Sequence, residues 1–353
     1  MALLERLGIQ VPIIQAPMAG VSTPEMAAAV SNAGGLGSIG IGATDCDGAR
    51  AMIAEVRRQT DRPFNVNVFV HANAREDRGR EQGWLAALAP VFAEFNAQPP
   101  TGLNTVYQSF ADYLEMQALL VELAPPVVSF HFGLPDPSVI VRLQAVGCVL
   151  LATATSLEEG EAIEAAGLDA VVAQGYEAGG HRGVFDPNAP DEQMTTLALV
   201  ELLVSGTMLP VIAAGGLMDG RDIAAMLQLG ASAAQLGTAF ILAPESNADH
   251  YYRAALAQAT GTVMTSAISG RPARCVSNKF TAWGAETLVR VPDYPRAYDV
   301  GKALNQVAKA AGEGGYGAQW AGTGAALATA LPAADLVRRL AAELAAAEAY
   351  RRH

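Results

Sequence analysis

The chain has 353 residues, of which 51% are hydrophobic and 16% are charged, and its formal net charge is −12. This composition supports a large buried core, while the negative charge argues against a sequence-independent grip on nucleic acid or on an anionic membrane. The three cysteines, Cys46, Cys148 and Cys275, form no closely spaced pair, so they indicate neither a disulfide framework nor a zinc site.

The start of the chain lacks the charged segment and the uninterrupted apolar stretch of a signal peptide. No segment reaches the ~18 uninterrupted apolar residues that a membrane-spanning helix needs. We therefore expect a cytoplasmic protein without a membrane partner.

Short apolar runs alternate along the chain with turns and with segments of helical length, a pattern typical of βα units. Eight runs are predicted to be strands: 13–18, 35–40, 64–70, 127–132, 149–154, 170–174, 210–214 and 234–240. The clearest helices are predicted at 23–33, 46–59, 156–166 and 220–229. Most of the strands are apolar on successive residues, as in a parallel sheet covered on both faces, and their number favours an α/β fold of the (β/α)8 barrel type.

The barrel is expected to span about residues 10–245, followed by a helical and loop extension over about 246–353, all within a single domain of residues 1–353. Two stretches exceed ordinary loop length: a long insertion after the third strand, at 72–107, and a second at 183–193. Insertions at the carboxyl ends of barrel strands commonly cover or shape an active site. We expect both to border the site.

Two consecutive strand ends carry small and polar residues. The run at 211–216 ends in paired glycines, and the next strand continues as Gln235-Leu-Gly-Thr238. In barrel enzymes the loops after strands seven and eight commonly hold a phosphate through backbone N–H groups. Either motif alone is explained equally well by a tight turn that ends a strand, but the two together favour a phosphate site.

The sixth strand runs into a glycine-rich segment, 173–183, that also carries Gln174, Glu177, His181 and Arg182. Glycines at this density indicate close approach of backbone to a flat cofactor. His181 is the candidate acid or base, since imidazole titrates near neutral pH, and the alternative is a surface histidine on a mobile loop. His131 either points into the barrel mouth or is a satisfied core histidine. No spacing of histidines and carboxylates predicts a metal site.

Six motifs together resemble the nitronate monooxygenases, formerly called 2-nitropropane dioxygenases, and two of them resemble class I of that family. The motifs are Gln15-Ala-Pro-Met18, Asn65-Val-Asn67, Val128-Ser-Phe-His-Phe-Gly133, the segment 169–183, Ala213-Ala-Gly-Gly216 and Gln235-Leu-Gly-Thr238. The resemblance covers about residues 5–325. It implies a TIM barrel that binds FMN and oxidises alkyl nitronates, notably propionate 3-nitronate, with O2 to a carbonyl product and nitrite, which is a detoxification.

The resemblance also assigns roles to single residues. His181 matches the catalytic histidine. The implied FMN contacts are Pro17, Met18, Asn67, Gln174, Gly179, Gly180, Gly216, Gln235, Leu236, Gly237 and Thr238. Asn65 and Asn67 point to the same side of their strand, and we expect Asn67 to be the one that contacts FMN.

A carboxylated nitronate needs a positive or hydrogen-bonding group at the rim of the pocket. The candidates are Tyr107, His131, Tyr298, Lys302 and Tyr316. The alternative functions are an FMN-dependent NADH:quinone reductase or an enoyl-acyl-carrier-protein reductase of the same barrel type, and, from another class, a barrel without flavin.

Overall fold

The computed structural model describes residues 2–350, and its centre is a closed barrel of eight parallel strands. The barrel strands are β1 (Ile13–Gln15), β2 (Gly37–Gly40), β3 (Phe64–Phe69), β4 (Val127–His131), β5 (Val149–Ala154), β6 (Ala170–Gln174), β8 (Val211–Ala214) and β9 (Ala233–Leu236). They are ordered β1-β9-β8-β6-β5-β4-β3-β2. Leu36, just before β2, closes the ring, because its N–H donates to the Ile13 carbonyl at 3.0 Å and its carbonyl accepts from the Gln15 N–H at 2.9 Å. The predicted (β/α)8 barrel is confirmed.

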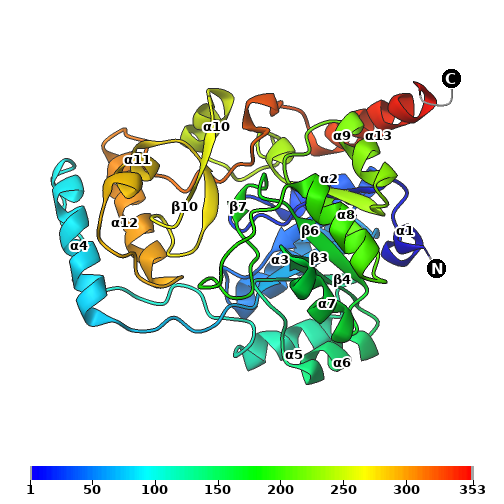
Figure 1. Ribbon diagram of the computed structural model, residues 1–353, viewed down its shortest axis with the longest axis horizontal. Coiled ribbons are helices and arrows are strands. Elements are labelled where there is room, and N and C mark those ends of the chain that lie inside the picture. The colour runs from blue at the N-terminus through cyan, green and yellow to red at the C-terminus, as the bar shows by residue number, and fades with distance from the viewer. Residues whose placement is uncertain (1, 351–353) are drawn as a thin grey trace.

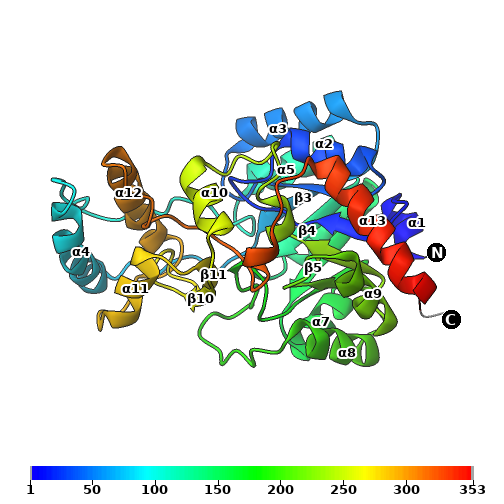
Figure 2. The same cartoon turned by 90° about the horizontal axis from the view of Figure 1, so that it is seen from above.

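Helices surround the barrel (Figures 1 and 2). In chain order they are α2 (Pro24–Asn32), α3 (Cys46–Gln59), α5 (Leu114–Leu123), α6 (Pro137–Ala145), α7 (Leu157–Ala165), α8 (Thr196–Gly206), α9 (Gly220–Gln228) and α13 (Ala333–Tyr350). The predicted starts are confirmed where the hydroxyls of Thr23 and Ser156 accept hydrogen bonds from the first turns of α2 and α7. The last helix, α13, packs between α2 and α9 and so completes the ring from the far end of the chain.

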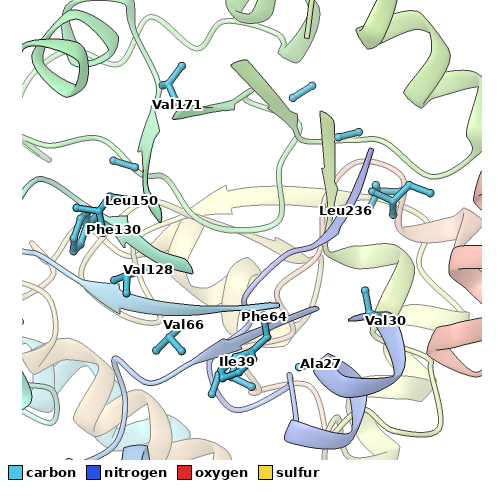
Figure 3. Close-up of a cluster of buried hydrophobic side chains, with 14 of the residues drawn as sticks. Ala27, Val30, Ile39, Phe64, Val66, Val128, Phe130, Leu150, Val171 and Leu236 are labelled. Atoms are coloured by element: carbon cyan, nitrogen blue, oxygen red, sulfur yellow. The ribbon is translucent and has the colours of Figure 1, made fainter. Parts of the chain in front are cut away.

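Between strands and helices lies the main hydrophobic cluster, part of which is drawn in Figure 3. It contains Val30 from α2 and strand residues such as Ile39, Val66 and Leu236. Burial of these side chains on the outer face of the strands fixes which residues point inward, since successive residues of a strand face opposite sides.

The inward side chains change character along the barrel axis. Near the starts of the strands they are apolar and pack with Leu3 and Leu7 of α1 (Leu3–Leu7), which closes that end: Val127, Leu151, Ala170 and Ala233. Near the carboxyl ends they are polar: Asn67, Ser129, Thr153 and Gln174. The polar layer therefore faces the end of the barrel where active sites of this fold lie.

A side lobe stands beside that end of the barrel (Figures 1 and 2). It consists of α4 (Arg78–Ala93) from the insertion after β3, and of β10 (Thr262–Thr265), β11 (Ala273–Val276), α11 (Lys279–Glu286) and α12 (Arg296–Ala310) from the C-terminal region. The lobe has its own hydrophobic cluster, which includes Trp84, Phe92, Phe280 and Leu304. Helix α10 (His250–Ala257) and the short 3-10 turn Ala325–Leu327 connect the lobe to the barrel. No helix within residues 2–350 is long and apolar enough to cross a membrane.

Two sequence predictions about strands were wrong in detail. The strand predicted at 234–240 ends at Leu236, and Thr238–Phe240 is a 3-10 turn closed by the Phe240 N–H on the Gly237 carbonyl at 2.9 Å. The strand predicted at 13–18 ends at Gln15, because the Met18 carbonyl accepts the N–H groups of Val21 and Ser22 in a turn. Both changes place irregular backbone at the barrel mouth.

A buried ion pair joins the two chain segments of the side lobe. The Arg296 guanidinium on α12 donates to the Glu81 carboxylate on α4 at 2.5 and 2.9 Å, and both side chains are less than a tenth exposed. Glu81→Ala leaves the buried guanidinium without this partner, so we expect the free energy of unfolding to fall by about 3–5 kcal/mol.

The matched control is Glu76→Ala, since Glu76 lies 3.5 Å from the same guanidinium but is 66% exposed and should contribute less than about 1 kcal/mol. Chemical denaturation followed by tryptophan fluorescence measures both variants, because Trp84 and Trp283 pack together in this lobe with ring centroids 5.1 Å apart. Equal losses in the two variants would contradict the assigned role of Glu81.

Candidate active site

A cavity of about 1350 Å3, counting the part open to solvent, lies at the carboxyl ends of the barrel strands. Its floor and inner walls come from the polar layer of the barrel, and its outer wall is aromatic, formed by Tyr107, Tyr294, Tyr298 and Trp320. Within residues 2–350, none of the side chains that line it is a carboxylate, an ammonium or a guanidinium group. The cavity is therefore polar and aromatic but carries no formal charge on its lining.

The histidine segment is fixed to the barrel through one carbonyl group. The backbone carbonyl of His181 accepts hydrogen bonds from His131 Nε2 at 3.2 Å and from the Gln174 side-chain nitrogen at 3.0 Å. Because a carbonyl only accepts, His131 must carry its proton on Nε2, and its Nδ1 then accepts from the Thr153 hydroxyl at 3.0 Å. The Gln174 oxygen accepts from the Gly183 N–H at 2.7 Å.

His181 itself forms part of a small antiparallel sheet rather than a loop. It lies on β7 (Gly180–His181), which pairs with β11, so that His181 is opposite Ala273. Its Nε2 lies 2.9 Å from the Ser269 hydroxyl, and that hydroxyl lies 3.2 Å from the Arg271 carbonyl. If the hydroxyl donates to this carbonyl, then Nε2 donates to the hydroxyl and Nδ1 keeps the free lone pair.

Both cavity histidines are held neutral. Burial, followed by the positive charges or imidazoles nearby, lowers the pKa of His181 to about 3 and that of His131 to about 4. Since each pKa lies below the ordinary value, the neutral imidazole is the form present at and above neutral pH. The tyrosines of the outer wall also stay protonated, as burial raises the pKa of Tyr107 to about 12.

Phe132 follows β4 in an unusual backbone conformation. Its φ of 78° lies in the left-handed region, which costs a bulky residue on the order of 1–3 kcal/mol. The conformation places the ring in the cavity wall, with its centroid 4.4 Å from the His131 ring and 5.7 Å from the His181 ring. Residues strained in this way cluster at functional sites, where the surrounding structure holds them in place.

Part of the cavity wall is a rim of backbone. Within residues 2–350, the N–H groups of Gly179, Gly216 and Gly237 have no acceptor, and all three glycines line the cavity. Gly216 has a φ of 74°, and a Cβ there would lie 3.0 Å from Glu177 Cβ. The Thr238 hydroxyl accepts the Gly322 N–H at 3.0 Å, which leaves its own proton free to donate. Unpaired N–H groups around a concave glycine turn are the chemistry that binds an anion.

The structure brings most of the predicted site residues into this one cavity. The predicted residues that line it are Pro17, Met18, Asn67, Tyr107, His131, Gln174, Gly179, Gly180, His181, Gly216, Gln235, Leu236, Gly237, Thr238 and Tyr298. Asn65 lies one layer deeper, fully buried, and donates to the Ser38 hydroxyl at 3.2 Å. Of the two asparagines, Asn67 alone lines the cavity.

Two predicted residues lie outside it. Tyr316 is buried in the core of the side lobe, with its ring centroid 5.5 Å from that of Phe95. Lys302 lines a neighbouring pocket behind the aromatic wall, where its Nζ lies 4.4 Å from the Tyr107 ring centroid and 5.2 Å from that of Tyr298.

Sequence reasoning missed several residues of the wall and one that contacts His181 from behind it, Ser269. Phe132 lies within the motif Val128-Ser-Phe-His-Phe-Gly133, next to the candidate His131. Its position as an aromatic residue before a glycine at a strand end was the signal that could have identified it. Ser269, Tyr294 and Trp320 follow no strand of the barrel, and no local pattern marks them. Within the described part of the chain, no cluster of three or more potential metal ligands is present.

Comparison with known proteins gives a consistent result. A sequence profile described as nitronate monooxygenase matches residues 1–343. The chain is 58% identical over 346 residues to a nitronate monooxygenase of Paraburkholderia phytofirmans, covering 97% of this chain and 94% of the relative. The structure of a nitroalkane oxidase from Streptomyces ansochromogenes matches with a TM-score of 0.90 at 41% identity, covering 97% of this chain and 98% of the other. FabK from Thermotoga maritima matches with a TM-score of 0.76 at 29% identity, over 99% and 97% of the two chains.

Proposed function

The chain belongs to the nitronate monooxygenase family, a family of oxidoreductases, and we propose that it oxidises alkyl nitronates with O2 in a detoxifying, FMN-dependent reaction. The substrate we propose is propionate 3-nitronate. The observation that carries the proposal is a cavity lined by hydrogen-bond donors and aromatic rings, without a carboxylate among residues 2–350, which contains both a neutral His181 and a rim of unpaired backbone N–H groups.

The residues of the rim fit FMN. The N–H groups of Gly179, Gly216 and Gly237 lack acceptors among residues 2–350, as an incoming phosphate requires. The Gln235 side chain lines the cavity and makes no hydrogen bond within the same range, so it is available to a ligand. Asn67 and Met18 complete the proposed set on the barrel side. When bound, FMN supplies the electron-accepting and oxygen-reacting chemistry, which no side chain of the cavity provides.

The aromatic wall is proposed to bind the substrate. Tyr294 is buried, and its hydroxyl has no hydrogen-bond partner among the described residues. Burial keeps Tyr107, Tyr294 and Tyr298 protonated by raising the pKa of each, so all three hydroxyls can donate. Protonated hydroxyls are suitable hydrogen-bond donors to the carboxylate of propionate 3-nitronate. Because they are neutral, they do not repel an anion.

The neutral imidazole of His181 is proposed to orient the nitronate or accept a proton from a nitroalkane. A nitronate is already deprotonated at carbon and needs no base, whereas a neutral nitroalkane must first lose its α-proton. An imidazole whose pKa is lowered to about 3 is a weak proton acceptor. The environment of His181 therefore favours the nitronate as substrate.

The reaction is tested by measuring oxygen uptake and nitrite release with propionate 3-nitronate, beside NADH oxidation with a quinone. We expect nitrite to appear as oxygen is consumed, and NADH oxidation to remain at background. Anaerobic bleaching of the cofactor by NADH, without nitrite formation from the nitronate, would instead favour the pyridine-nucleotide reductases considered above.

The cofactor is tested by denaturing the purified protein and identifying the chromophore that is released, which we expect to be FMN. Gly216→Ala should reduce FMN affinity by about tenfold or more, because the added Cβ would press on Glu177 and displace the rim. Gly312→Ala is the matched control, since Gly312 has a similar φ of 82° but nothing within 4 Å of a Cβ. Release of FAD, or equal FMN loss in both variants, would refute this assignment.

The role of His181 is tested with nitroethane and ethyl nitronate, which differ by one proton. His181→Asn should lower nitroethane turnover by roughly a hundredfold or more, and ethyl nitronate turnover by much less. His250→Asn, at an exposed position outside the cavity, should change neither.

The pH dependence follows from the lowered pKa. Because His181 accepts a proton only when neutral, nitroethane activity should rise with pH through the pKa, which is about 3, and be level above about pH 5. A rise centred near pH 6.5 would show that the imidazole titrates at its ordinary value in the working enzyme. Equal damage to both substrates would show that His181 orients substrate rather than accepting a proton.

A further inference from the structure

A buried guanidinium group lies behind the cavity wall. Arg271 is 2% exposed, and its Cζ lies 4.1 Å from the centroid of the Phe132 ring. Its Nη2 donates to the Val184 carbonyl, and its Nε is buried without a partner. Within residues 2–350, no carboxylate oxygen lies within 4.0 Å of the group, so Arg271 is a buried cation without a direct counter-ion.

A buried cation in this state needs a physical explanation. Removal of a guanidinium from water is costly unless a negative charge compensates it. Elsewhere in the fold a carboxylate compensates a buried guanidinium directly: Arg182, which is equally buried, pairs with Asp191 at 2.8 and 2.9 Å. Within residues 2–350 Arg271 has no such partner, but the Phe132 ring that it contacts belongs to a residue of the cavity wall.

The position of Phe132 connects the cation to the site. Its ring lines the cavity and lies beside three imidazoles, with centroids 4.4 Å from His131, 5.7 Å from His181 and 6.4 Å from His71. The nearby Arg271 charge contributes to lowering the pKa of each of these histidines. Arg271 therefore places a permanent positive charge close to the cavity, in addition to that of Lys302 behind Tyr107, while the histidines that line the cavity are neutral.

We propose that Arg271 is a specificity-determining residue that makes the cavity selective for a small planar oxyanion over a neutral molecule of the same shape. It acts through space across the Phe132 ring and does not touch the ligand. The inference rests on the proposed function in taking the nitronate group as the natural oxyanion. The bound anion supplies a nearby negative charge, whereas within the described residues the carboxylates of Glu159 and Asp186 act on Arg271 only from beyond 4.0 Å.

The selectivity is tested by equilibrium binding of propionate and propionamide to the purified holoprotein, measured by calorimetry. Propionate has the planar two-oxygen group of a nitronate but cannot reduce the cofactor, and propionamide is its neutral analogue. We expect the wild-type protein to bind propionate about tenfold more tightly or better, and Arg271→Met to lose most of that preference. Arg271→Lys keeps the charge and should retain most of it.

Arg274→Met is the matched control. Arg274 is also buried, at 7% exposed, and its Cζ lies 4.9 Å from the Tyr176 ring centroid, but Tyr176 does not line the cavity. This variant should keep the wild-type preference for propionate. The ratio of kcat/KM for ethyl nitronate to that for nitroethane should follow the same order among the variants.

Three results would overturn the proposal: equal binding of the two probes by the wild-type protein, an unchanged preference in Arg271→Met, or a loss in Arg271→Lys as large as in Arg271→Met. If Arg271→Met does not fold, it is replaced by Arg271→Gln, which keeps a hydrogen-bond donor for the Val184 carbonyl without the charge. The ratio of propionate to propionamide affinity in the wild-type protein can still refute the proposal by itself. Failure of the proposed function can be told apart from failure of this proposal. If the protein did not oxidise nitronates, nitrite formation would be absent but the binding preference for propionate would remain.

Discussion

The backbone carbonyl of His181 joins the two halves of this molecule. It accepts one hydrogen bond from His131 on β4 and one from Gln174 on β6, so the short strand β7 is fastened to the barrel. The same strand pairs with β11, which belongs to the side lobe. Because the cavity lies between the barrel mouth and that lobe, the position of the imidazole in it depends on this carbonyl. The polar layer of the barrel thus serves first to position backbone and second to face a ligand.

The electrostatics of the site differ from those of the whole chain. The protein has a formal net charge of −12, yet within the described residues no carboxylate lines the cavity, and its polar groups are backbone N–H groups, hydroxyls, side-chain amides and neutral imidazoles. Most of these can donate a hydrogen bond to an anion. Since desolvation by the aromatic wall strengthens each such interaction, an uncharged lining together with the nearby cation behind Phe132 is what we propose to hold an oxyanion.

Sequence patterns predicted the residues of the cavity mainly where these lie on a barrel strand or directly after one. Period-two alternation places Asn67 rather than its neighbour Val66 inside the barrel, and paired glycines after β8 mark the backbone rim. Ser269, Arg271, Tyr294 and Trp320 could not be found in this way, since they reach the cavity wall or the residues behind it only through packing of the C-terminal region against the barrel mouth. The pairing of β7 with β11 was missed for the same reason: two residues make too short a strand for a pattern, and their partner lies about ninety residues away.

The path of the chain explains why the cavity combines residues that follow barrel strands with residues from the C-terminal region. After β9 the chain leaves the barrel, builds most of the outer wall of the cavity from residues 246–332, to which the insertion after β3 adds Tyr107, and returns as α13 to fill the gap between α2 and α9. The wall is therefore held at both ends by the barrel, through β9 and through α13. A substitution in the wall that shifts β11 must move β7 as well, and with it His181. The positions of His181 and of the neighbouring Gly179 are consequently coupled to the wall through one antiparallel pairing, whereas Gly216 and Gly237 of the rim follow β8 and β9, which pair with each other in the barrel.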